Sequence, residues 1–283
     1  MKPMLKYRGG KSKELNHYIN YIQSEDYEIY YEPFLGGGAT YFALQPQRAF
    51  INDINSKLIN FYLDVKNNFA LLKEQLSNLE EIYNRNQSEY EELKRTNPDR
   101  RIPNANENLY YEIRNEFNHP TGRFLNGTLY YFINKTAYSG MIRYNRNGEY
   151  NVPFGRYKNF NTNLISLEHN LLLQTTEIFN VDYSQIFNHA TPRDIMFLDP
   201  PYDCVFNDYG NINNEDGFNE NEHRRLAENF INLNTRAVMV ISKTPLTEEL
   251  YRNFIVGEYD KNYSVNIRNR FKNSAIHLIV KNY

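Results

Sequence analysis

Short apolar runs separated by longer amphipathic stretches recur along the chain and predict a layered α/β fold. The runs lie at residues 27–30, 49–51, 177–179, 194–198 and 237–241. Continuous apolar runs of this length are typical of strands buried on both faces of a parallel sheet. After the second run, residues 58–79 repeat apolar side chains at alternating spacings of four and three. This period predicts one long amphipathic helix.

Two further segments complete the expected organisation. Residues 263–267 and 275–280 are alternating stretches joined by a polar turn, which predicts an antiparallel C-terminal hairpin. Residues 80–108 are charged, rich in asparagine and interrupted by Pro98 and Pro103, so we expect an exposed excursion there. The chain of 283 residues suits one or two domains with a substantial core.

The most informative motif is the tetrapeptide of residues 199–202, which follows the apolar run at 195–198. Two prolines cannot continue a ladder or a helix, so Asp199, the Pro200 carbonyl and Tyr202 are held at a strand end. A carboxylate and a rigid carbonyl can accept the protons of a planar amine, and an aromatic face can stack on its ring. An ordinary turn after a strand is the alternative for the tetrapeptide alone.

A glycine-rich segment, residues 31–40, joins the first run to a short helix expected at 41–44. Glycines at this place let a ligand approach the backbone closely. The second run ends at Asp53, where nucleoside-binding α/β folds commonly hold a ribose diol. A cap for the helix that follows is the alternative role for Asp53. No lysine-serine phosphate pattern follows the glycines, which disfavours a nucleoside triphosphate.

Taken together, these motifs resemble the Dam-type DNA adenine-N6 methyltransferases, the alpha-group or D12 class. The resemblance also covers residues 5–11, 110–118, 134–145 and 148–158, in the family order, so that it spans nearly the whole chain. It implies a doubly wound, Rossmann-like methyltransferase sheet, residues 1–57 and 168–283, that binds S-adenosylmethionine. It also implies an inserted, mainly helical target-recognition domain with a β-hairpin, residues 58–167. The chain has Tyr7, Ser139 and Met141 where the family often has Trp, Asn and Leu, respectively.

The resemblance assigns roles to individual residues. Asp199, Pro200 and Tyr202 are the expected catalytic residues. The expected donor site contains Tyr7, Lys11, Phe34, Gly36, Gly38, Asp53, Asp182, Tyr183 and Asp199, with Asp182 and Tyr183 facing the donor's adenine. The expected DNA-binding residues are Arg114, Tyr138, Met141, Arg143, Asn145, Arg156 and Lys158. Arg143 stands where the family places its guanine-reading arginine, which makes GATC the leading target.

Charge distribution supports a nucleic-acid partner, although the formal net charge is only −2. Residues 121–160 carry six basic side chains and Glu149 as the sole acid, interleaved with tyrosines. This pattern is typical of surfaces that bind phosphates and unstacked bases. A solvated basic face is the alternative, and Arg143 could equally bind a phosphate.

Cysteine and histidine content argues against metal or thiol chemistry. The single cysteine, Cys204, excludes an internal disulfide, and no histidine motif accompanies it as a catalytic partner. The six histidines show no metal-ligand spacing, so no metal is expected. We expect a monomer that acts on double-stranded DNA in the cytoplasm, or in the host cytoplasm if the gene is viral, without a membrane span or signal peptide.

The predicted reaction is methyl transfer from S-adenosylmethionine to N6 of an adenine flipped out of duplex DNA. Two alternatives are an RNA N2-guanine methyltransferase and a non-catalytic DNA-binding regulator with a degenerate fold. The recognition-hairpin block argues against the first, and the intact Asp199, Tyr202 and glycine turn argue against the second.

Overall fold

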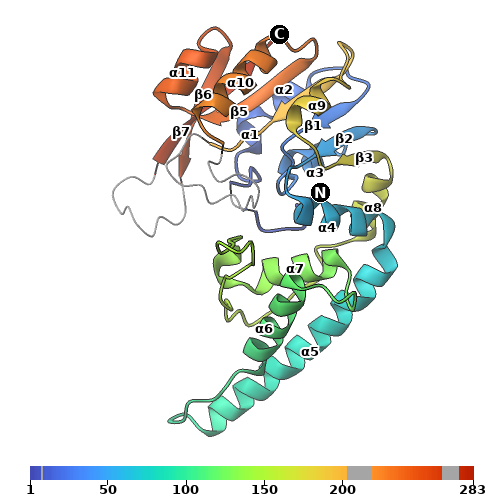
Figure 1. The fold of residues 1–283 in the computed structure, drawn as a ribbon, viewed down its shortest axis with the longest axis vertical. Helices are drawn as coiled ribbons and strands as arrows, with labels where there is room; N and C mark the ends of the chain where they lie inside the picture. The colour runs from blue at the N-terminus through green and yellow to red at the C-terminus, as the bar shows by residue number, and fades with distance from the viewer. Residues whose placement is uncertain (8, 203–217, 263–273) are drawn as a thin grey trace.

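The computed structural model describes residues 1–7, 9–202, 218–262 and 274–283 (Figure 1). Within these residues, seven strands form one sheet in the order β3-β2-β1-β4-β5-β7-β6. The strands are β1 (Tyr30–Glu32), β2 (Ala49–Asn52), β3 (Thr176–Phe179), β4 (Ile195–Leu198), β5 (Arg236–Ser242), β6 (Ile255–Asn262) and β7 (Ser274–Lys281). Strands β1 to β5 pair in parallel, and β7 runs antiparallel to both β5 and β6. The predicted doubly wound sheet with an antiparallel C-terminal hairpin is confirmed.

Apolar side chains of the sheet alternate between two cores because successive residues of a strand point to opposite faces. Ile195 and Phe197 of β4 belong to one core, and Met196 and Leu198 belong to the other. The helices around the sheet are α1 (Leu15–Tyr18), α2 (Asn20–Gln23), α3 (Ala39–Leu44), α4 (Ser56–Asn67), α8 (Leu167–Gln174), α9 (Tyr183–Phe187), α10 (Glu220–Ile231) and α11 (Pro245–Tyr251). These helices cover both faces, so the sheet is an inner layer.

A helical part extends away from the sheet (Figure 1). It contains α5 (Phe69–Thr96), α6 (Ala105–Asn118), α7 (Asn126–Thr136) and the 3-10 turn η1 (Tyr138–Gly140). Helix α7 lies at its centre, with every residue after Asn126 buried. Helix α4 contacts α7 on one side and β3 and α8 on another, so it joins the two parts. The division of the chain at residues 58 and 167 stays a prediction.

The single helix predicted over residues 58–79 is wrong, because the structure breaks it at Asn68. There the backbone has φ −123° and ψ 28°, and the Asn68 side-chain amide donates to Asp64 Oδ1 at 2.8 Å. The other Asp64 oxygen accepts the Gly127 amide at 2.7 Å, which pins α4 to α7. The apolar stripe nevertheless stays buried through Leu79, because the break interrupts the helix at one residue only and leaves the stripe on the same face.

Residues 80–108 are mostly exposed, as predicted, but most of them are helical rather than irregular. Helix α5 continues to Thr96, and α6 begins at Ala105. Residues 84–96 are mostly good helix formers, and Tyr83 extends the buried stripe beyond Leu79. Only the connection containing Pro98 and Pro103 is non-helical, which agrees with the inability of proline to continue a helix.

Strand boundaries differ from the predictions at β1, inside the sheet, and at β6, on its edge. The first parallel ladder begins at Tyr30 rather than at residue 27, since the backbone before it is held by the Arg193 carbonyl and the Asp194 carboxylate. The first strand of the C-terminal hairpin was predicted at residues 263–267, which lie outside the described residues, and β6 instead occupies Ile255–Asn262. The prediction for residues 275–280 is confirmed by β7.

Candidate active site and DNA interface

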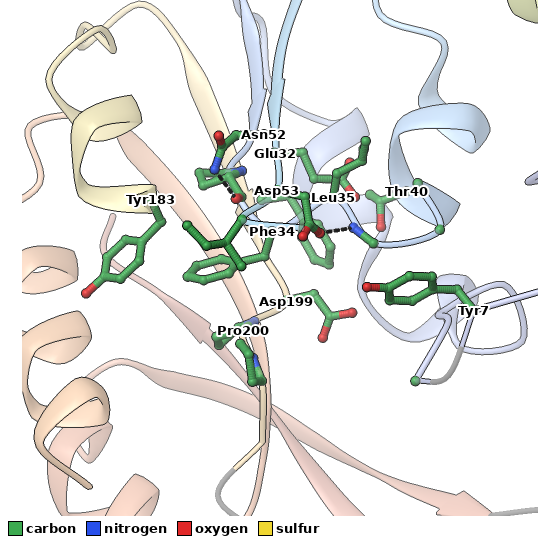
Figure 2. A pocket seen from close by; sticks show the side chains of 18 of the residues that line it. Tyr7, Glu32, Phe34, Leu35, Thr40, Asn52, Asp53, Tyr183, Asp199 and Pro200 are labelled. Carbon is green, nitrogen blue, oxygen red and sulfur yellow. Dashed lines mark hydrogen bonds between the residues drawn. The ribbon is translucent and has the colours of Figure 1, made fainter. Parts of the chain in front are cut away.

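A pocket opens where the loops after four neighbouring strands meet. The carboxyl ends of β3, β2, β1 and β4 lie side by side, and they lead into Asp182, Asp53, the glycine turn and Asp199 respectively. The order of the strands reverses between β1 and β4, which is where open α/β sheets bind ligands. Residues distant in sequence therefore converge on one cavity (Figure 2).

The glycine turn after β1 brings an aromatic ring close to the backbone. Gly36 and Gly38 have φ of 50° and 67°, a region that side chains disfavour. A Cβ at Gly36 or Gly37 would lie 2.9 or 2.8 Å from Tyr7, so the close approach of this ring requires glycine. Phe34, in the same turn, packs against Tyr183 with ring centroids 5.0 Å apart. Together these groups line the pocket with aromatic surface.

Asp53 points into the pocket from the end of β2. Its Oδ2 accepts the Gly36 amide at 2.9 Å, and its Oδ1 accepts the Asn55 amide at 2.9 Å. Burial raises the pKa of Asp53, and these two backbone bonds oppose that rise. The cap of α4 is Asn55, whose side chain accepts the Leu58 amide. The alternative of Asp53 as the helix cap is therefore wrong.

The tetrapeptide of residues 199–202 contacts a buried lysine from the N-terminal segment. Lys11 Nζ lies 2.6 Å from Asp199 Oδ1 and donates a short hydrogen bond to the Tyr202 hydroxyl. Tyr202 also donates to Asp199 Oδ1 at 3.3 Å. Among the described residues, Lys11 and Tyr202 both bind Oδ1 of Asp199, so Oδ2 of Asp199 remains available to a ligand. Figure 2 shows Asp199 and Tyr7 pointing toward each other across the cavity.

Asp182 and Tyr183 line the other end of the pocket. Asp182 caps α9 through the Ser184 amide at 3.0 Å, and Arg225 from α10 binds both of its oxygens at 3.1 and 2.9 Å. The Arg225 guanidinium also lies 4.7 Å from the centre of the Tyr183 ring. Desolvation raises the pKa of Asp182, but the Arg225 and Ser184 bonds outweigh it and leave that pKa below its ordinary value.

The structure adds pocket residues that the sequence analysis missed. Glu32, at the end of β1, is 2% exposed, and burial raises its pKa to about 8 despite a bond from the Tyr30 hydroxyl at 2.6 Å. The position of Glu32 directly before the glycine turn is the sequence feature that could have indicated it as a pocket residue. Phe218 and Arg225 also line the cavity, but they lie beyond the tetrapeptide and carry no local motif.

The residues predicted to bind DNA lie in the helical part and fall into two groups. Tyr138, Arg143, Arg156 and Lys158 are exposed, and Met141 is half-buried. Arg156 and Lys158 lie 3.9 and 3.3 Å from Glu107 and Glu91, pairs of the exposed kind that stabilise a fold little.

The other two predicted DNA-binding residues already make bonds within the fold. Arg114 donates to the Val152 carbonyl at 3.1 Å. The Asn145 side chain accepts the amides of Asn147 and Glu149, which closes the hairpin turn. These two side chains therefore bind backbone groups between residues 147 and 152.

The recognition hairpin exists as isolated bridges rather than long strands. Tyr144 pairs with Tyr150, and Ala137 pairs with Phe154. A Cβ at Gly155 would lie 2.7 Å from the Ala137 carbonyl oxygen, so this crossing requires glycine. Ser139 has φ 56°, a left-handed conformation that costs serine more than the Asn often found there in the resembling family. The strained residue follows the half-exposed Tyr138 and turns the chain beside it.

Two further properties concern metals and membranes. Across the ranges that the structure describes, three or more His, Cys, Asp or Glu side chains nowhere gather as a metal site. In the same ranges, each helix is too short or too polar to cross a bilayer. Cys204 lies outside the described residues.

The mixed sheet, the glycine turn and the converging carboxylates define a Rossmann-like methyltransferase fold. A model of the D12 class N6 adenine-specific DNA methyltransferases matches residues 7–267. The chain is 34% identical to the type II methyltransferase M.CviBI of Paramecium bursaria Chlorella virus NC1A, with both chains covered completely. It is 32% identical to the type II methyltransferase M1.LlaDCHI of Lactococcus lactis subsp. cremoris, covering 100% of this chain and 96% of the relative.

A DNA adenine methylase of Salmonella typhi is 28% identical over 88% of this chain and 83% of its own length. The chain belongs to the D12 class of N6 adenine-specific DNA methyltransferases. The predicted family and the prediction of an enzyme are confirmed, and its substrate class is DNA.

Glu32 should make the stability of the fold depend on pH. Its folded pKa of about 8 exceeds the ordinary value near 4.5, so the folded state holds a proton that the unfolded state releases between these values. The contribution of Glu32 to the free energy of unfolding is therefore fully present below about pH 4.5 and is lost as the pH rises through 8. We expect Glu32→Gln to remove this decline. Melting temperatures from pH 5 to pH 8.5 test this, and parallel curves for wild type and variant would contradict it.

Proposed function

We propose that the enzyme transfers the methyl group of S-adenosylmethionine to N6 of an adenine flipped out of duplex DNA, with GATC as the leading target. The observation that carries this proposal is one cavity holding both Asp53 with the glycine turn and Asp199 with Tyr202. A donor nucleoside and an acceptor amine can therefore meet in it. The family assignment favours this reaction over the RNA methyltransferase and the non-catalytic regulator.

The pocket fits S-adenosylmethionine by its chemistry. Asp53 offers a carboxylate suited to a ribose diol, and Phe34 and Tyr183 offer aromatic surface suited to an adenine. Asp182 Oδ2 accepts one bond from Arg225 among the described residues, which leaves it capacity for the donor's amino group. Tyr7 and Lys11 border the side of the cavity that leads to Asp199. When bound, the donor supplies an electrophilic methyl group.

Asp199 and Pro200 would activate the target amine. The lone pair of an adenine amine is delocalised into the ring, so the nitrogen is a poor nucleophile. Hydrogen bonds from its two protons to Asp199 Oδ2 and the Pro200 carbonyl would draw the nitrogen toward tetrahedral geometry and stabilise the positive charge that develops. Lys11 orients the carboxylate by binding its other oxygen. Tyr202 would stack on the base and fix its plane.

The target base must leave the helix before it can enter this cavity. Flipping costs roughly a few kcal/mol of stacking and pairing. Tyr138 is half-exposed on η1, where its ring can fill the vacated space. Arg143 is exposed and donates through Nε to Asn151 at 2.9 Å, which leaves the two terminal nitrogens to reach a base or a phosphate. We expect a monomer to carry all of these groups.

Asp199→Ala should abolish methylation, because preorganised electrostatic groups are typically worth about 10²-fold or more in rate. Asp199→Asn should be severely impaired, since the amide carries no negative charge. Tritium transfer from labelled donor to duplex DNA measures the rate, and gel-shift titration verifies DNA binding. Retention of more than about a tenth of the wild-type rate by Asp199→Ala would contradict the assigned role.

Asp53→Ala should weaken the binding of S-adenosylmethionine. A hydrogen bond to a charged group is worth roughly 1.5 to 3 kcal/mol, so calorimetry should show about a tenfold or greater loss. Asp26→Ala, at an exposed aspartate outside the pocket lining, is the matched control and should bind normally. Equal affinities of the two variants would place the ribose elsewhere.

Arg143→Ala should relax the preference for one guanine, because a bidentate arginine contact discriminates by about 1 to 3 kcal/mol. Arg146→Ala, which removes another exposed arginine of the same hairpin, should slow all sites alike. Methylation of a randomised duplex library, sequenced at base resolution, separates these outcomes. A site preference unchanged in Arg143→Ala would make Arg143 a phosphate contact and remove the physical support for GATC.

A further inference from the structure

A second cluster of charged side chains lies behind Tyr202 and takes no part in the reaction described above. Glu14 accepts the Tyr259 hydroxyl at 2.7 Å, lies 3.0 Å from His277 Nδ1 and pairs with Lys261 Nζ at 2.5 Å. The Glu14 and Lys261 side chains are 8% and 11% exposed, and His277 is fully buried. Burying these groups is costly, so their retention beside the active site calls for a function.

The cluster touches the catalytic tetrapeptide through one ring. Tyr259 and His277 stand directly opposite each other on β6 and β7, where cross-strand side chains meet. The His277 imidazole packs edge-on against Tyr202, with centroids 5.0 Å apart and planes at 64°. Edge-to-face contacts of this kind favour one orientation of a ring over others. The plane of Tyr202 is thus set by His277 on one side and by Lys11 at its hydroxyl.

Glu14 in turn fixes the imidazole. Hydrogen bonds from His277, Lys261 and Tyr259, together with the charge of Lys11, overcome desolvation and lower the pKa of Glu14 to about 2, so it stays a carboxylate. Burial lowers the pKa of His277, which therefore remains neutral at pH 7. A neutral imidazole has one N–H, and a carboxylate beside Nδ1 holds that proton there. The acceptor at Glu14 therefore selects one tautomer and one ring orientation.

We propose that His277, seated by Glu14, is a positioning residue that holds the Tyr202 ring in the plane required for stacking on the target adenine. This inference rests on the proposed function, because it concerns the ring that would receive the flipped base. Because His277 lies on β7, the proposal gives the antiparallel part of the sheet a role in the reaction. His277 contacts no reacting atom and acts only through Tyr202.

Two substitutions at His277 separate the ring from its hydrogen bond. His277→Asn keeps an N–H near the position of Nδ1 but removes the ring, whereas His277→Phe keeps a ring without the N–H. The matched control is His169→Asn, at a buried histidine of α8 that bonds Ser166 and the Lys2 carbonyl instead. Circular dichroism and melting curves establish that each variant is folded.

Single-turnover methylation at saturating donor and DNA should fall about tenfold or more in His277→Asn, since a misplaced reacting group costs up to about 10²-fold. Donor and DNA dissociation constants should stay near wild type. His277→Phe should recover much of the rate, and His169→Asn should match wild type. With 2-aminopurine as the target base, fluorescence of the complex should be higher in His277→Asn than in wild type, because the base stacks less firmly.

A wild-type rate in folded His277→Asn would overturn the inference, as would equal losses in His277→Asn and His277→Phe. A lower rate explained entirely by weaker donor or DNA binding would also overturn it. If the wild-type protein itself methylates no adenine in duplex DNA, the proposed function fails instead. The wild-type assay therefore distinguishes the two failures.

Discussion

The buried ion pair between Lys11 and Asp199 is the contact on which the arrangement of the site depends. The lysine side chain is 2% exposed and lies 2.6 Å from the carboxylate. A buried ammonium is tolerated only beside a compensating charge and hydrogen-bond acceptors. Moving the N-terminal segment would separate Lys11 from Asp199 and would therefore cost free energy. The pair ties a segment from the start of the chain to a strand that ends almost two hundred residues later.

The same N-terminal segment connects the helical part to the sheet. Asn134 of α7 exchanges two hydrogen bonds with the Lys6 backbone, at 2.9 and 2.7 Å. Tyr7 then lies against the glycine turn, and Glu14 reaches the antiparallel edge. The pocket, the tetrapeptide of residues 199–202 and helix α7 therefore all contact one short stretch of chain.

The departures from the sequence-based predictions have separate physical causes. Buried parallel strands are continuous apolar runs, so the inner strands were found with small boundary shifts. At the break, Asp64 accepts bonds from both Asn68 and Gly127, and no periodicity reveals the contact with Gly127. Residues 80–96 are polar because this part of α5 is largely exposed, which agrees with the predicted exposure, but polarity alone does not distinguish an exposed helix from a loop. The helix propensity of these residues, rather than their polarity, indicated the local structure.

The sequence by itself determined the strand ends that carry the chemistry, because the tetrapeptide, the glycine turn and Asp53 each depend on residues adjacent along the chain. It also determined the family through the order of these blocks. The tertiary structure alone decided which distant side chains complete the site: Arg225 on Asp182, Glu32 beneath the glycine turn, and His277 with Glu14 behind Tyr202. The order of the strands brings these partners together, and buried polar groups such as Glu32 and Glu14 need hydrogen-bond partners where they lie; neither requirement leaves a local pattern in the sequence.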